Sequence, residues 1–377
     1  MSNHRSSVYF HLRTASRERM VKSFNIANTI VDSFAPNLDV QGTHSTYTSK
    51  KYSIKSKLMC YVKKIIPLVN LRFKGISLRY DFHYYWGCMP AFSIREHIIE
   101  LDNPYCLTYY DTKIGNFRKR FIKSRLLKAR HIVCMSQTSR GHTKQIFGDS
   151  ISKKLRVSYP YMDDNLGKHV DNQSKIRFLF VGTDFILKGG RELLSAFTQI
   201  ANPNISLTIV SSLSEDSLGI VDSDSRITVI PLCDGKTLME NVYPNHDIFI
   251  LPSLYESFGV VLLEALSFGM GIISVQTYAT HEVVKDGING CLIHHPILKT
   301  EMVGENEVVS CVKYTISDFK NKYIKKELNE TLVRDLKMAI EVGVENSVQW
   351  SKASSELFAE RFSPEVWKAN FLSLIEG

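Results

Sequence analysis

The stretch from Asp247 to Ile293 constrains the fold of this chain more than any other part of the sequence. It opens with a short apolar run over 247–252, which is typical of a parallel strand buried on both of its faces. After a polar elbow, residues 260–268 are long enough for a helix and carry a core-facing apolar stripe. A second apolar run follows over 272–275. The pattern predicts a strand–helix–strand unit of an α/β protein.

Two glutamates of this stretch fall where such proteins bind ligands. In open parallel sheets a ligand lies at the carboxyl ends of the strands, against the amino termini of helices. Glu256 lies in the elbow that follows the first strand, and Glu264 lies in the second turn of the helix. Gly259, between them, lets the backbone approach a ligand closely. We therefore expect both carboxylates to face the same crevice.

The string PSLYESFGVVLLEALSFG, followed by HEVVKDGINGCLI, resembles the E-x7-E signature of the retaining GT-B glycosyltransferases of family 4. The resemblance implies two Rossmann-like domains that face each other across a cleft, with a carboxy-terminal helix that crosses back to the first domain. It implies the limits 1–165 for an acceptor-side domain, 166–352 for a nucleotide-sugar-binding domain and 353–377 for the returning helix. A ligand-free Rossmann-type sheet with two surface glutamates is the structural alternative.

The resemblance also implies roles for individual residues. Glu264 would bind the ribose hydroxyls, Glu256 would bind and stabilise the transferred sugar, and Lys188 would compensate the charge of the leaving diphosphate. The remaining donor-binding positions would be Gly182 and Thr183 of the turn after the strand at 176–181, together with Ser257, Phe258, Gly259 and Val260 at the helix start. Helix amides and a lysine can stabilise a departing nucleotide without a metal, so no metal ligand and no cofactor besides the donor is expected.

The chain departs from the family pattern at two positions. Thr183 stands where the family has an arginine, and Arg191 is one candidate for the second cation. No histidine matches the one that family members place near the donor sugar, so Asp102, with Asn103 beside it, is the substitute on the first domain. Asp163 and Asp164 form a D-x-D-like pair, but they fall in the polar segment 161–175 and are interpreted as linker residues.

Composition narrows the setting. The seven cysteines are scattered and form no C-x-x-C, which indicates a reducing cytoplasm rather than a disulfide framework or a zinc site. No apolar run is long enough to span a membrane. The net charge of +9 is concentrated, because nine Lys or Arg fall within 40–80 and seven within 118–130, with no acidic residue in either segment. Such patches point to an anionic partner.

These observations predict a cytoplasmic, retaining hexosyltransferase-like enzyme that transfers a sugar from a nucleotide-diphosphate sugar to a glycan or a polyprenyl-diphosphate-linked sugar, as in lipopolysaccharide or capsule biosynthesis. The basic segments Lys50–Arg79 and Arg118–Arg130 would contact an anionic membrane surface. Another GT-B enzyme such as a phosphorylase or an epimerase, a nucleic-acid-modifying glucosyltransferase and a non-catalytic glycan-binding protein are the alternatives. No base-stacking or groove-reading motif supports a nucleic-acid partner.

Overall fold

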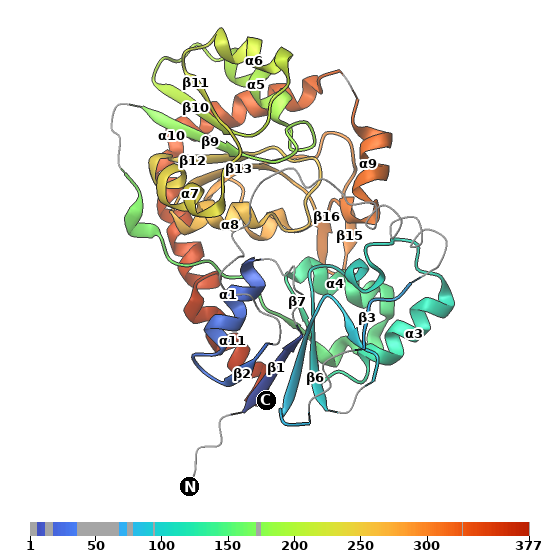
Figure 1. Cartoon of the computed structure of the whole chain (residues 1–377). Helices are drawn as coiled ribbons and strands as arrows, with labels where there is room; N and C mark the ends of the chain where they lie inside the picture. The colour runs from blue at the N-terminus through green and yellow to red at the C-terminus, as the bar shows by residue number, and fades with distance from the viewer. Residues whose placement is uncertain are drawn as a thin grey trace.

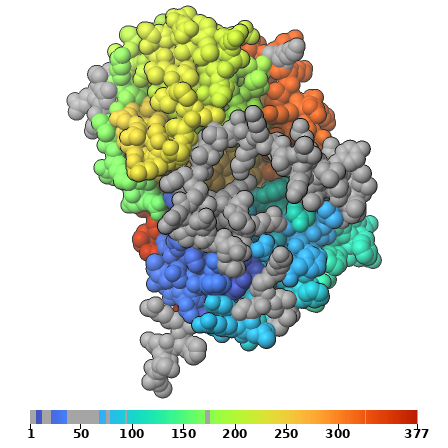
Figure 2. Space-filling view, viewed as in Figure 1, coloured from blue at the N-terminus to red at the C-terminus, as the bar shows by residue number. Residues whose placement is uncertain are grey.

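The computed structural model describes residues 6–11, 18–35, 68–73, 78–92, 95–170, 175–325 and 327–376. They form two lobes, each built around a parallel sheet (Figure 1). The basic segment at 40–80 lies mostly outside the described residues. In the space-filling view, the blue and cyan amino-terminal lobe and the green and yellow second lobe occupy opposite ends of the molecule (Figure 2).

The first domain contains a parallel sheet of six strands, because its strands are short apolar runs joined by helical crossovers. Their spatial order is β2 (Asp32–Phe34), β1 (Ser7–His11), β4 (Phe82–Trp86), β6 (Glu96–Leu101), β7 (His131–Cys134) and β8 (Leu155–Val157). The helices of this domain are α1 (Glu18–Ala27), α3 (Asn116–Leu126) and α4 (Gln137–Phe147). A small parallel pair, β3 (Leu71–Arg72) with β5 (Met89–Pro90), lies beside the main sheet.

The second domain contains another parallel sheet of six strands, in the order β11 (Ile227–Ile230), β10 (Ile205–Val210), β9 (Ile176–Val181), β12 (Ile248–Leu251), β13 (Gly271–Val275) and β14 (Gly290–Ile293). In chain order this is 3-2-1-4-5-6, so the direction of winding reverses between β9 and β12. The carboxyl ends of those two strands therefore border the crevice in which a doubly wound sheet binds its ligand.

Helices and one hairpin complete the second domain. The helices are α5 (Gly190–Thr198), α6 (Glu215–Asp222), α7 (Gly235–Thr237), α8 (Val260–Ser267), α9 (Ile316–Tyr323) and α10 (Glu330–Arg361). The hairpin pairs β15 (Glu301–Val303) with β16 (Asn306–Val308), and it lies against α4 of the first domain. None of the described helices combines the length and the apolar character that crossing a membrane requires.

The last helix, α11 (Pro364–Glu376), returns to the first domain. The expectation that a carboxy-terminal helix crosses back to the first domain is therefore confirmed. Its apolar face, with Trp367, Phe371 and Ile375, packs into the same core as Val8 and Phe10 of β1. The 32-residue α10 delivers it there, since α10 leaves the second sheet and ends at Arg361, beside the first domain (Figure 1). The predicted limit at 352 falls inside α10, because the helix has no break before Phe362.

The structure corrects two predicted elements and adds one strand that the sequence did not predict. The apolar spacing from Met20 to Phe34 predicted one continuous helix, but α1 ends at Ala27 and residues 32–34 pair with β1 as the edge strand β2. Ala201 was expected on the buried face of the helix after Lys188, but α5 ends at Thr198 and Ala201 is exposed. Strand β10 was not predicted, although Ile205–Val210 alternates in burial as a strand does.

Candidate active site

Two loops meet at the point where the winding of the second sheet reverses. One loop follows β9 and carries Lys188, and the other follows β12 and carries Glu256. They touch at Gly189, whose φ is +73° and where a Cβ would lie 2.2 Å from the carbonyl oxygen of Pro252. Only glycine fits both this left-handed conformation and this approach. The sequence therefore places a glycine where the two loops must come into contact.

Gly259 begins α8 in a second left-handed conformation, with φ +77°. The amides of Val260 and Val261, the first two residues of the helix, have no intrahelical acceptor. Leu262, Ala265 and Leu266 are fully buried beneath, as their spacing predicted. Because the buried face fixes the helix, the amino terminus of α8 is held in place at the crevice.

A cavity of about 230 Å³ lies between these loops and the first domain. Nine of the eleven predicted site residues line it, so the sequence pattern identified residues that converge in space. Asp102 and Met135 come from the first domain, and the ten other lining residues come from the second: Val181, Gly182, Thr183, Lys188, Glu256, Ser257, Phe258, Gly259, Val260 and Val261. The cavity is thus shared by both domains.

Lys188 and Glu256 form an ion pair between Nζ and Oε1 at the wall of this cavity. Their side chains are only 20% and 15% exposed. Burial weakens solvent screening, so the two charges interact more strongly than a surface pair would. An anionic ligand in the cavity would compete with Glu256 for Lys188.

Asp102 faces the cavity from the carboxyl end of β6. Its Oδ1 accepts a hydrogen bond from the amide of Asn103 at 2.7 Å, and its Oδ2 accepts one from the hydroxyl of Tyr110 at 2.7 Å. Tyr110 and its neighbour Tyr109 both have positive φ, at 64° and 56°. A non-glycine residue rarely adopts this conformation, and such strain is typical of functional sites.

Asn103 and Glu264 are the two predicted residues that do not line the cavity. The side-chain oxygen of Asn103 accepts a hydrogen bond from the amide of Tyr105 at 3.0 Å, so it caps the short helical turn Pro104–Thr108. The carboxylate of Glu264 accepts a hydrogen bond from the hydroxyl of Tyr243 at 2.7 Å. Glu264 therefore lies one helical turn behind the cavity, beside a buried tyrosine.

Arg191 does not supply the cation that Thr183 lacks. Its guanidinium donates to the carbonyl of Lys325 at 3.0 Å and lies 3.6 Å from the carboxylate of Glu192. Arg191 is the second residue of α5, and its side chain contacts the segment before α10 and does not line the cavity. Lys188 is thus the one lysine or arginine among the described residues that line the cavity.

Three lining residues and one supporting residue were missed. Met135, Val181 and Val261 follow or flank predicted elements, and the position of Met135 just after β7 could have signalled it. The thiol of Cys311 donates to the carbonyl of Glu256 at 3.0 Å, and burial raises the pKa of this thiol to about 12. Nothing local in the sequence around Cys311 announces a contact with position 256.

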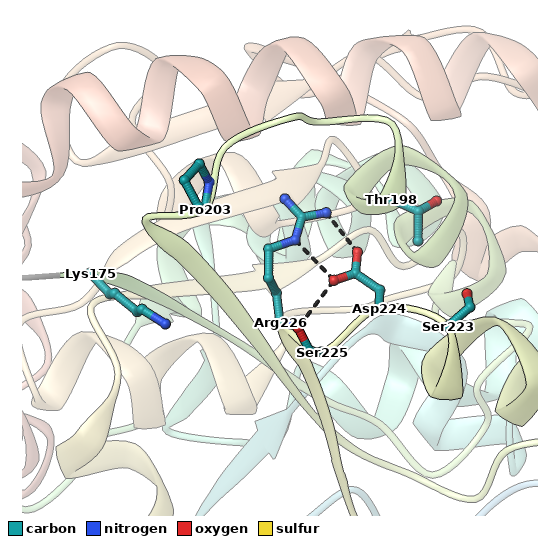
Figure 3. A pocket seen from close by; sticks show the side chains of 7 residues that line it. All are labelled: Lys175, Thr198, Pro203, Ser223, Asp224, Ser225 and Arg226. Carbon is teal, nitrogen blue, oxygen red and sulfur yellow. Dashed lines mark hydrogen bonds and ion pairs between the residues drawn. The ribbon is translucent and has the colours of Figure 1, made fainter.

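A second, more open cavity of about 570 Å³ lies at the opposite edge of the second sheet, where Lys175 and Arg226 precede their strands (Figure 3). The guanidinium of Arg226 already has partners within the protein. It donates to both carboxylate oxygens of Asp224, at 2.6 and 2.9 Å, and to the carbonyl of Asn202. This second cavity lies at the amino ends of the strands, away from the crevice. Within the described ranges no cluster of three or more His, Cys, Asp or Glu side chains is arranged to hold a metal ion.

Two parallel-sheet domains with a shared cavity at their facing edges define the GT-B fold, and solved structures of that fold match nearly the whole chain. A glycosyltransferase from Rickettsia africae superposes with a TM-score of 0.62 at 12% identity, covering 99% of this chain and 98% of that one. The Anabaena protein HepE in complex with UDP and glucose superposes with a TM-score of 0.58 at 12% identity, covering 99% and 100%.

Sequence comparison supports the superfamily. Residues 162–304, which carry most of the cavity, match the family model "Glycosyl transferases group 1". An "uncharacterized 41.2 kDa protein in cps region" of Klebsiella pneumoniae is 26% identical over 203 residues, which is 51% of this chain and 56% of that protein. The chain thus aligns with about half of that relative's length. The family-model match thus covers the greater part of the second domain, and the solved structures show that the chain has the GT-B fold.

Proposed function

We propose that the protein is a glycosyltransferase that moves a sugar from a nucleotide-diphosphate sugar to a glycan or lipid-linked acceptor. The observation that carries this proposal is the convergence of Lys188, Glu256 and the amino terminus of α8 in a cavity that Asp102 closes from the other domain. The group 1 match supports the activity, and the complexes of HepE with UDP and with UDP-glucose support a nucleotide-sugar donor.

In the proposed reaction the donor diphosphate replaces Glu256 as the partner of Lys188. The lysine and the amides at the start of α8 then stabilise the negative charge that develops on the leaving nucleotide. Glu256, released from the ion pair, binds hydroxyls of the sugar and stabilises its positive, oxocarbenium-like transition state. Glu264, one turn further along α8, binds the ribose, and its contact with Tyr243 orients the carboxylate.

We propose retention of anomeric configuration and no catalytic metal. In this proposal neither Glu256 nor Glu264 acts as a covalent nucleophile, and the acceptor attacks on the face that the nucleotide leaves. The departing phosphate would take the acceptor's proton. The partly buried cavity limits access of water, which would otherwise hydrolyse the donor.

The acceptor side of the proposal is a lipid-linked sugar at an anionic membrane surface, in surface-polysaccharide biosynthesis. The relative in the Klebsiella cps region supports the pathway. The basic helix α3 supports the membrane contact, because Phe117 at its start is 87% exposed beside a run of lysines and arginines. Flotation with liposomes of acidic lipids tests that contact, and absence of binding at low salt rejects it. The segment Lys50–Arg79 lies mostly outside the described residues.

A ligand screen tests the activity. The purified protein is heated with UDP-, GDP-, ADP- and dTDP-sugars, and a true donor should raise its melting temperature in a concentration-dependent manner. Lys188→Ala should abolish most of that shift, because it removes the cation of the diphosphate site. Lys236→Ala is the matched control, since Lys236 pairs only with Glu240 on an exposed helical turn. Stabilisation by no nucleotide sugar, with no turnover of any, would contradict the proposal.

A further inference from the structure

Glu282 belongs to the second domain but binds the first. It ends the short helical turn Thr280–Glu282, which follows β13, and it is 4% exposed. Its Oε2 accepts from the amide of Gln137 and its Oε1 from the amide of Thr138, both at 2.8 Å. The hydroxyls of Thr138 and Tyr159 donate to the same carboxylate at 2.7 and 2.8 Å. Both of its oxygens are thus bonded to residues that precede β9.

The four donors explain how a carboxylate is tolerated at this depth. The first amides of α4 have no intrahelical acceptors, and the positive end of the helix favours a negative charge. The side chain of Ser136, the residue before α4, accepts from the amide of Ser139. Glu282 therefore completes the cap of a helix that belongs to the opposite domain. Neither partner is satisfied without the other, so separating them would expose unpaired polar groups on both sides.

Two further contacts join α4 to the second domain. Nδ1 of His142 lies 2.8 Å from the hydroxyl of Tyr278, in a buried hydrogen bond. The backbones also touch, since a Cβ on Gly141 would lie 2.9 Å from the carbonyl oxygen of Val303. The contact made by Glu282 is thus one end of a docked surface that continues along α4 for more than one turn.

The two sides that Glu282 joins are the two walls of the cavity. Met135, which lines the cavity, lies two residues before Gln137 on the first domain. On the second domain the amide of Ala279 donates to the carbonyl of Ser257 at 3.2 Å, and Ser257 also lines the cavity. We propose that Glu282 is a positioning residue: by capping α4 it holds the first domain's wall of the cavity at its distance from the donor loops. For its effect on turnover, this inference rests on the proposed function.

The test compares Glu282→Gln with Glu192→Gln. Glu192 is 2% exposed and has both of its contacts within the second domain, to Arg191 and to the amide of Asn329. Amide hydrogen exchange should accelerate about tenfold or more at Gln137 and Thr138 in Glu282→Gln, because an amide side chain cannot accept from all four donors. Exchange at these two amides should not change in Glu192→Gln.

Kinetics provide the second measurement. Since the donor is held mainly by the second domain, Glu282→Gln should leave the donor dissociation constant within about twofold. It should lower transfer to the acceptor about tenfold or more and raise the ratio of donor hydrolysis to transfer. Equal losses of donor binding and transfer, or unchanged exchange at Gln137 and Thr138, would overturn the inference.

Milder variants keep the test decisive if Glu282→Gln does not fold. Tyr159→Phe and Thr138→Val each remove one hydroxyl from the carboxylate and leave the two amide contacts in place. Each should give a smaller change in the same direction, and no change in either would count against the inference. The exchange measurement needs no substrate. If the wild-type protein turned over no nucleotide sugar, the proposed function would fail while the exchange result still decided the role of Glu282.

Discussion

Lys188 and Glu256 illustrate what a sequence motif specifies at the scale of single residues. They are 68 positions apart, yet their side chains meet because Gly189 allows the two loops to touch. Each side chain neutralises the charge of the other. The proposed reaction must separate this pair, so the charge at either position should affect both stability and turnover.

We expect Glu256→Gln and Glu264→Gln to differ in kind. Glu256→Gln should lower kcat by roughly 100-fold or more, because it removes negative charge beside the developing oxocarbenium. Glu264→Gln should raise the KM for the donor about tenfold with kcat nearly unchanged, because the ribose contact is made equally in ground and transition states. Steady-state kinetics with varied donor separate the two. Identical profiles for the variants would contradict the assigned roles.

The sequence predicted the lining of the cavity better than the directions of side chains behind it. Glycines and a glutamate at strand ends are local signals, and they identified Gly182, Lys188 and Glu256. The side-chain directions of Arg191 and Glu264 depend instead on partners that are remote in the sequence. Arg191 donates to the carbonyl of Lys325, and Glu264 accepts from the hydroxyl of Tyr243. No local pattern encodes such partners, so the direction of a side chain next to a correct motif could not be predicted.

At the scale of elements, the loop from Gly182 to Gly190 is constrained both by an internal contact and by a contact with α9. Its aspartate, Asp184, accepts from the amide of Leu187 at 3.1 Å and pairs with Lys320 of α9. Lys188 is therefore presented by a loop that is closed internally and held from outside. A substitution that introduces backbone strain or a steric clash into this loop should therefore displace the side chain of Lys188.

Gly189→Ala should destabilise the protein by about 2 kcal/mol or more and weaken donor binding. The added Cβ would meet the carbonyl of Pro252 at 2.2 Å in a backbone conformation that costs an alanine about 1 kcal/mol or more. Gly219→Ala is the control, because Gly219 lies within α6 with nothing within 4 Å of a Cβ, and alanine should stabilise that helix by about 0.5–1 kcal/mol. Denaturant midpoints measure both, and equal effects would refute the expectation.

Elements whose ends are marked in the sequence were predicted more accurately than elements whose apolar spacing continues past their ends. Strands β9 and β13 and helix α8 fall within one residue of their predicted limits, because each is an apolar run with a glycine at one end or at both ends. Helix α1 was predicted too long, since Val31 and Phe34 continue its spacing by chance. The pairing of residues 32–34 with β1 prevailed over that local signal.

At the scale of the whole molecule, buried histidines are distributed over both domains and their interface. Burial lowers the pKa of His11 to about 3, with help from His83, and lowers the pKa values of His97, His142 and His246 to about 4. In the unfolded chain these groups would titrate near 6.5. Between these limits the unfolded state binds more protons than the folded state.

Stability should therefore be complete above about pH 6.5 and fall as the pH is lowered toward 4, by about 1.4 kcal/mol per pH unit for each of these histidines. Asp247 acts in a different window, because its pKa is lowered to about 2 and its contribution is lost only below its unfolded value near 4. Calorimetric melting temperatures between pH 7.5 and 5 check the histidine effect. A melting temperature that is flat or rises as the pH falls would disprove it.

The return of α11 also bears on how the chain reaches this structure during synthesis. Domains usually fold in the order in which the ribosome releases them. Here Trp367, Phe371 and Ile375 fill the core beside β1, so the first sheet stays without part of its cover until the final residues of α11 emerge. The second domain, though translated later, has all of its strands and most of α10 before then. The lobe that is made first is thus the last to be completed.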